Sequence, residues 1–286
     1  MTARTLLHRH PARRDDIGEL QTRRPLPGPG LAHLDPFLFL NHHGPQVYPP
    51  HNAGLPFGPH PHRGFETVTF ILAGALAHRD SGGHESVIEA GGIQWMTAGS
   101  GLVHAELSPA AFKRDGGDLE ILQLWVNLPA RLKFTPPAYH GISAADMPLI
   151  EADEGRVRIQ LASGSHQDVQ GAVPTLTSIT LMTVEIAPGG QVSLPAPAGA
   201  TVFCYGVRGT LQIAGRDEAP WHLFEFADDG DHIDIASREG AVLLYGHAAP
   251  FAEPIVAHGP FVMNTADEIR QAIRDYQAGL FGDVPD

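Results

Sequence analysis

The sequence is poor in cysteine, basic residues and long apolar runs, and each shortage excludes a class of protein. Cys204 is the only cysteine, so no disulfide can form within the chain, as in proteins of reducing compartments. Lys and Arg number 19 against 32 Asp and Glu, which gives a net charge of −13 and no basic run for phosphate backbones. No segment approaches the roughly 18 apolar residues of a membrane span or resembles a secretion signal. We therefore expect a cytoplasmic protein that binds neither nucleic acid nor membrane directly.

Glycine and proline are abundant instead, at 32 and 25 residues. They separate short runs of Val, Ile, Leu, Thr and aromatic residues, and each run has the length of one strand. Clusters at 81–83, 90–92 and 188–190 have the composition of turns. Many short strands joined by Gly/Pro turns are typical of an antiparallel sandwich or barrel, so the sequence predicts an all-β fold.

Two segments of the chain share one pattern, which favours a tandem arrangement. Residues 67–78 and 202–213 both read as a strand, a tight glycine turn and a second strand. Between them, residues 136–148 are rich in turn formers and interrupt the strand pattern. We therefore predict one β-barrel domain over residues 1–135, a linker over 136–148 and a second barrel domain over 149–286.

One helix is predicted near the end of the chain, within the second domain. Thr265 and Glu268 have the spacing of a capping box, in which each side chain bonds the other residue's backbone at a helix start. An apolar stripe from Ile269 to Leu280 follows at helical spacing, and Gly279 supplies a stop.

Two short segments carry the residue types of a metal site. His60 and His62 are two residues apart, as are His104 and Glu106. Residues at that spacing on a strand point to the same face, so all four side chains can enter one barrel interior. Imidazole suits Fe, Zn, Cu and Ni, and histidines mixed with a carboxylate in an open site are typical of non-haem Fe(II). The sequence therefore predicts an Fe(II)-type centre in the first barrel, although other divalent transition metals fit the same donors.

The spacing around these residues resembles the cupin superfamily. Gly54, His60, His62 and Glu66 follow the first cupin motif, and Gly101 and His104 begin the second, with Ser108 where Asn is usual. In most cupins the glutamate of the first motif is a ligand, which would be Glu66.

The amino-acid sequences of several segments resemble the pirin family more closely. These segments are residues 35–42, 59–68, 94–99, 101–106, 122–128 and 259–265. In pirins the fourth ligand is the glutamate two residues after the second-motif histidine, which corresponds to Glu106. The resemblance then implies that Glu66 lies next to the ligands without binding the metal itself. The resemblance implies two jelly-roll-like cupin barrels in tandem, the second without metal.

The resemblance also implies a function. Some pirins cleave flavonols such as quercetin with O₂ and release carbon monoxide, so we expect a quercetin 2,3-dioxygenase-type enzyme in which Glu106 takes the substrate's hydroxyl proton. The alternative is a non-enzymatic regulator whose metal redox state alters a surface that docks a protein partner. A third reading is a cupin isomerase or hydrolase that polarises a carbonyl without O₂. We expect a monomer.

Overall fold

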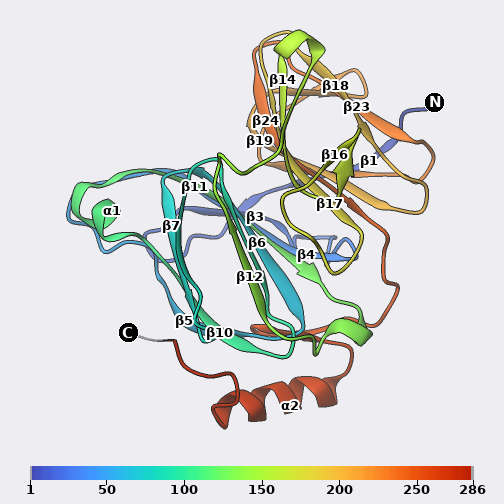
Figure 1. Ribbon diagram of the computed structural model, residues 1–286. Helices are drawn as coiled ribbons and strands as arrows, with labels where there is room; N and C mark the ends of the chain where they lie inside the picture. Colours follow the sequence, from blue (N-terminus) through green and yellow to red (C-terminus); the bar gives the residue numbers. More distant parts are fainter. Residues whose placement is uncertain (1, 285–286) are drawn as a thin grey trace. The chain divides into compact units, whose positions relative to one another are not determined.

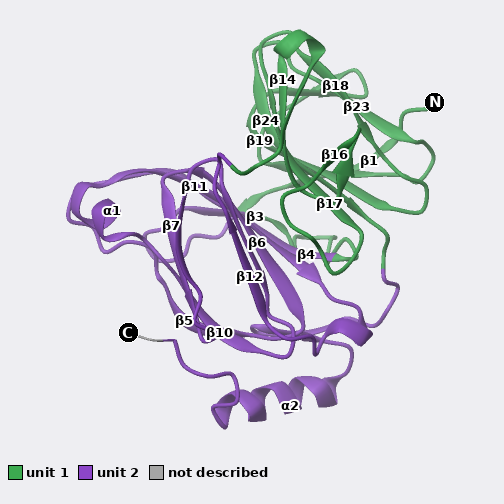
Figure 2. Cartoon of the chain, in the orientation of Figure 1, with its two compact units in different colours: residues 1–13, 24–36, 146–250 green, residues 14–23, 37–145, 251–286 purple. Residues whose placement is uncertain are grey.

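The computed structural model describes residues 2–284, which form two compact units (Figures 1 and 2). Unit 1 combines residues 1–13, 24–36 and 146–250, and unit 2 combines residues 14–23, 37–145 and 251–286. The strands of both units pair in antiparallel fashion to form barrel-like pairs of sheets. The predicted all-β fold with two barrels and a helix near the C-terminus is therefore confirmed.

Unit 2 contains the residues of the predicted metal site. Its larger sheet has the strand order β12 (Ala138–Ile142), β9 (Ile93–Thr97), β6 (Phe65–Ala73), β11 (Gly117–Asn127), β4 (Phe37–Tyr48), β3 (Thr22–Leu26) and β2 (Arg13–Arg14). Its smaller sheet has the order β5 (Phe57–His62), β10 (Leu102–Leu107), β7 (Ala75–Asp80) and β8 (Glu85–Glu89). The remaining elements of this unit are α1 (Ala110–Asp115), a 3₁₀ turn (Ala130–Leu132), the hairpin β25 (Val256–His258) and β26 (Phe261–Met263), and α2 (Ala266–Gln277).

Unit 1 repeats the same construction of a seven-stranded and a four-stranded sheet. The larger sheet has the order β1 (Leu6–Pro11), β22 (His222–Phe226), β19 (Thr201–Gly209), β24 (Ala241–Ala248), β17 (Ile179–Ile186), β14 (Val157–Ser163) and β13 (Leu149–Ala152). The smaller sheet has the order β18 (Gln191–Pro195), β23 (His232–Ala236), β20 (Leu211–Ile213) and β21 (Arg216–Glu218). A 3₁₀ turn (Asp153–Gly155) and the hairpin of β15 (Ser165–His166) and β16 (Val169–Gln170) complete it.

The core of each barrel follows from strand alternation. In unit 1, alternate residues of β14, β17, β19 and β24 pack into one continuous apolar cluster that includes Val184, Cys204 and Tyr245. In unit 2, β6 is buried on both faces, and Ile71 packs in a cluster with Leu119 and Ile121 of β11. β6 and β11 thus form the buried centre of the larger sheet, and the strands that carry the predicted ligands, β5 and β10, pair with each other in the smaller sheet.

The compact units differ from the predicted domain boundaries. Residues 138–142, expected in the linker, form β12 and pair with β9 in unit 2. The segment 251–286, expected in the second domain, belongs to unit 2, because Phe261 and Ile269 form an apolar cluster with Val103 of β10. The first 13 residues and the segment 24–36 belong instead to unit 1.

The helix itself begins as predicted. The Thr265 side chain accepts a bond from the Glu268 backbone, and the Glu268 carboxylate accepts one from Thr265, so the capping box is complete. Ile269 and Ala272 are the buried residues of α2, whereas Leu280, beyond its end, is 70% exposed. Among residues 2–284, neither helix has the length and apolar composition that a membrane span needs.

Candidate metal centre

Three of the four predicted ligands converge in unit 2. His60 and His62 lie on β5, and His104 lies directly opposite His60 on β10. One nitrogen from each ring lies within 4.8 Å of the others, and the ring centroids are 4.4 to 5.0 Å apart. Alternation on two paired strands therefore brings the three imidazoles together, as the His-x-His spacing predicts.

Burial keeps two of these imidazoles neutral, which is the form that binds a metal. Burial, with a smaller contribution from His60, lowers the pKa of His62 to about 3. Burial also places the pKa of His104 well below its usual range, with His62 and His60 acting in the same direction. A neutral ring offers a lone pair to a cation without first losing a proton.

Backbone carbonyls lie within hydrogen-bond distance of the Nδ1 atoms of His60 and His62. His60 Nδ1 lies 2.8 Å from the Gly58 carbonyl oxygen, and His62 Nδ1 lies 3.3 Å from that of Pro260. A carbonyl can only accept, so each Nδ1 carries a hydrogen, and Nε2 of the neutral His62 ring keeps its lone pair. Such bonds orient the ligands of metal sites and fix their tautomers.

His104 shows most directly that these residues fit a metal ion. The residue is 1% exposed, and neither of its ring nitrogens has a hydrogen-bond partner within the described chain. A buried polar atom without a partner costs about 1–3 kcal/mol. A divalent cation held by His60, His62 and His104 would supply a partner for one of these two nitrogens, so the donor set fits the predicted metal.

Glu106 is buried beside this group but is not among its converging donor atoms. It lies two residues after His104 on β10, on the same face of the strand, and is 4% exposed. Its Oε1 accepts a bond from Thr69 Oγ1 at 3.1 Å, and its Oε2 accepts one from Gln123 Nε2 at 2.6 Å. The carboxylate is thus fixed by two neutral donors, and its role as the fourth ligand stays a prediction.

Glu66, the alternative carboxylate, occupies the other face of its strand. Thr69, which contacts Glu106, is three residues further along β6, and an odd spacing on a strand places two side chains on opposite faces. Glu66 accepts a bond from the Thr97 hydroxyl at 2.6 Å. Burial raises the pKa of Glu66 above its usual range, although the Thr97 bond acts in the opposite direction. This arrangement favours Glu106 over Glu66 as a ligand.

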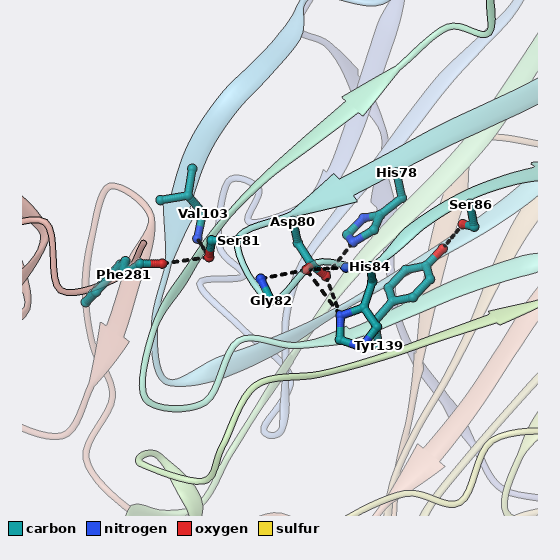
Figure 3. Close-up of polar contacts among 9 residues, drawn as sticks. All are labelled: His78, Asp80, Ser81, Gly82, His84, Ser86, Val103, Tyr139 and Phe281. Atoms are coloured by element: carbon teal, nitrogen blue, oxygen red, sulfur yellow. Dashed lines mark hydrogen bonds and ion pairs between the residues drawn. The ribbon is translucent and has the colours of Figure 1, made fainter. Parts of the chain in front are cut away.

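A chain of polar residues that the sequence did not predict as part of the site begins beside His104 with His78. His78 is buried on β7, with its ring centroid 5.5 Å from that of His104. Its Nε2 lies 2.9 Å from Asp80 Oδ2, and His84 Nδ1 reaches the same carboxylate at 3.1 Å (Figure 3). Tyr139 stacks on His78 with centroids 4.0 Å apart. The spacing of His78 and Asp80, again two residues, was the available signal.

Aromatic side chains line another side of the three histidines. The Trp125 ring centroid lies 5.3 Å from that of His62, and the Phe65 centroid lies 5.0 Å from it. Phe65 is fully buried, as expected of a core residue, whereas Trp125 is partly exposed and stacks on Phe39. The surroundings of the site therefore combine an apolar wall with the polar group of Glu106 and Gln123.

Comparisons with known proteins agree with this architecture. The family model "Pirin" matches residues 19–126, and the model "Pirin C-terminal cupin domain" matches residues 181–282. A Pseudomonas aeruginosa protein named "Putative quercetin 2,3-dioxygenase" is 36% identical over 249 residues, which cover 87% of each chain. Human pirin is 35% identical over 268 residues, covering 90% of this chain and 86% of its own.

A solved structure shows that the likeness extends over the whole fold. The crystal structure of quercetin 2,3-dioxygenase from Acinetobacter baumannii superposes with a TM-score of 0.91 at 32% identity and covers 99% of both chains. The two matching family models, the relatives at about 36% identity and the paired antiparallel barrels together place the chain in the pirin family of the cupin superfamily.

Proposed function

We propose that this protein is a metal-dependent dioxygenase of the quercetin 2,3-dioxygenase type, with an Fe(II)-type ion held by His60, His62, His104 and Glu106. The observation that carries the proposal is the convergence of three imidazoles, two of them buried, in which both nitrogens of His104 lack a partner within the described residues. Its likeness to the named dioxygenase of Acinetobacter baumannii supports the substrate class.

An iron ion in such a site supplies Lewis-acid and redox chemistry toward a chelating substrate and O₂. The chain's own groups supply orientation and proton transfer. Glu106, held by Thr69 and Gln123, is the base that takes the proton of a substrate hydroxyl. Trp125 is partly exposed beside His62, packed between Phe39 and Phe65, and adds an apolar border to the site for an aromatic substrate.

The test is aerobic incubation of iron-loaded protein with quercetin, with loss of flavonol absorbance and release of carbon monoxide measured together. We expect both signals from the parent protein and neither from the anaerobic control or from His104→Ala. The matched control is His258→Ala, which removes an exposed histidine of β25 and leaves the rate unchanged. A parent rate no higher than that of His104→Ala refutes the proposal.

A further inference from the structure

A second group of metal-ligating side chains lies in unit 1, in the barrel expected to be metal-free. His8 and His10 lie on β1, and Glu225 lies on β22, directly opposite His8. One donor atom from each of the three residues lies within 4.8 Å of the others. We propose that His8, His10 and Glu225 form a second metal site, which binds a divalent zinc-class ion independently of the proposed dioxygenase centre.

Strand geometry places the three side chains on one face of the sheet. His8 and His10 are two residues apart, so both point to the same side of β1. Glu225 lies between Phe224 and Phe226, which both pack in the core of the unit, so its carboxylate points to the opposite side. Glu225 is therefore opposite one imidazole and diagonal to the other, within reach of both.

The distances match the edges of a coordination polyhedron. Oε2 of Glu225 lies 3.2 Å from His8 Nδ1 and 3.0 Å from His10 Nε2. Metal–ligand bonds of about 2.0–2.1 Å at angles of 90° to 109° give ligand–ligand edges of about 2.9–3.4 Å. Both imidazoles thus contact the same oxygen atom, at distances that also suit hydrogen bonds, and the donor atoms of His8 and His10 lie within 4.8 Å of each other, so a cation could replace the hydrogens between these three groups.

Accessibility and charge also suit a cation. The side chain of His8 is 65% exposed, whereas those of His10 and Glu225 are only 13% and 25% exposed. The site is thus anchored in the sheet and open on the His8 side, where water can complete the coordination. Arg9, the nearest cation in sequence, turns away and pairs with Glu218 at 2.6 Å. Two imidazoles and one carboxylate suit Zn²⁺ and Ni²⁺, and we commit to Zn²⁺ as the probe.

The location of the site gives the ion a structural consequence. β1 is an edge strand, and β22 is its neighbour in the seven-stranded sheet. A cation shared by His8, His10 and Glu225 would join the two strands through their side chains in addition to the backbone ladder. Because the ion binds only when β1 is docked, it stabilises the docked strand.

The experiment counts zinc in tag-free protein that carries His60→Ala and His104→Ala, so that the proposed dioxygenase centre contributes nothing. Equilibrium dialysis at neutral pH followed by elemental analysis should find one zinc ion per chain. Adding His8→Ala and His10→Ala should abolish it, and adding Glu225→Gln should weaken it about tenfold or more. The matched control is His232→Ala, because His232 contacts two carboxylates, of Asp231 and Asp234, without a second imidazole in its group. This control should retain the zinc.

Hydrogen exchange provides a second measurement that does not depend on the number of zinc ions per chain. Zinc should slow the exchange of backbone amides in residues 6–10 of the His60/His104 variant and have no such effect once His8 and His10 are replaced. Zinc retained after His8 and His10 are replaced, or bound only at millimolar concentration, overturns the proposal. Because the background lacks His60 and His104, failure here says nothing against the proposed dioxygenase, and failure of the quercetin assay leaves this site untouched.

Discussion

Arg63 and Asp275 form an ion pair in which Nη1 of the guanidinium lies 2.7 Å from Oδ2 of the carboxylate. Arg63 directly follows His62, and Asp275 lies in the last part of α2. The guanidinium also donates from Nε to the Ser100 carbonyl at 2.7 Å and lies 4.6 Å from the Phe281 ring centroid. The C-terminal segment is thereby fastened to the strand end that carries a candidate ligand.

Removal of this ion pair should destabilise unit 2. Arg63 is 6% exposed, so Arg63→Ala removes a buried guanidinium together with its ion pair, its bond to the Ser100 carbonyl and its packing on Phe281. We expect Arg63→Ala to lower the free energy of unfolding by about 2 kcal/mol in urea titrations, mainly through the lost charged hydrogen bonds. The control is Asp267→Asn, which breaks an exposed pair with Arg270 on the same helix and should change stability by less than about 1 kcal/mol. Equal effects of the two variants would contradict this account.

The same pair predicts a pH dependence. The hydrogen bond from Arg63 lowers the pKa of Asp275 below its usual range. A carboxyl group with a lowered folded pKa contributes stability above its unfolded pKa of about 3.9, and the contribution is lost as the pH falls from there through the lowered pKa. The stability difference between the parent and Asp275→Asn should therefore be largest above about pH 4 and disappear in stronger acid. Urea titrations over a pH series measure it, and a constant difference would show that the ion pair is not its cause.

The two buried glutamates should respond differently to the same isosteric change. Glu106→Gln removes a charge on the histidine face of the barrel, and we expect its iron affinity to fall by about 100-fold or more. Glu66→Gln changes a carboxyl on the opposite face of β6 and should leave iron affinity unchanged. Competition with a chromogenic chelator measures both constants. The reverse ranking would transfer the ligand role to Glu66.

Lys133 should be a major contributor to the stability of unit 2. Its Nζ donates to the Gly64 carbonyl at 2.9 Å, to Asn127 Oδ1 at 2.8 Å and to the Val262 carbonyl at 3.0 Å, and the residue is 1% exposed. Lys133→Met leaves three buried acceptors without their donor, so we expect a loss of about 3 kcal/mol or more in urea unfolding. Lys113→Met, at a partly exposed position of α1, is the control and should have little effect.

Chelation should reveal the stabilising effect of the metal. An ion present at about 100 times its dissociation constant adds about 2.7 kcal/mol to the free energy of unfolding. We therefore expect a chelator to lower the melting temperature of iron-loaded protein and to leave that of His104→Ala unchanged, as measured by calorimetry. A chelator effect of equal size in both proteins would place the responsible metal elsewhere.

Local rules predicted the parts of the fold that depend on neighbouring residues. The spacing of His60 and His62 is enough to place both rings on one strand face, and Thr265 with Glu268 is enough to start a helix. Antiparallel pairing of β5 with β10 then places His104 beside His60 and His62. Such pairing is expected in a barrel of antiparallel strands. The all-β class followed from the same alternation of short runs and turns.

The domain boundaries depend on contacts that no local pattern encodes. Arg63 and Asp275 are 212 residues apart, and Lys133 contacts the carbonyl of a residue 129 positions away. Composition marks turn-rich stretches, and it cannot show which barrel a strand or helix joins after the turn. For the same reason His78 and His84 could not be linked to Tyr139 in advance, since the connection runs between separate strands.

Each unit is assembled from three separate stretches of the chain, and this interleaving matters during protein synthesis. The barrel with the three clustered histidines includes residues 251–286, which are synthesised after all three histidines. The nascent chain can therefore present all of its imidazole donors long before the clamp of Arg63 and Asp275 can close. A chain cut before residue 251 would therefore keep His60, His62 and His104 but lack the hairpin β25–β26 and helix α2, whose residues pack against β10.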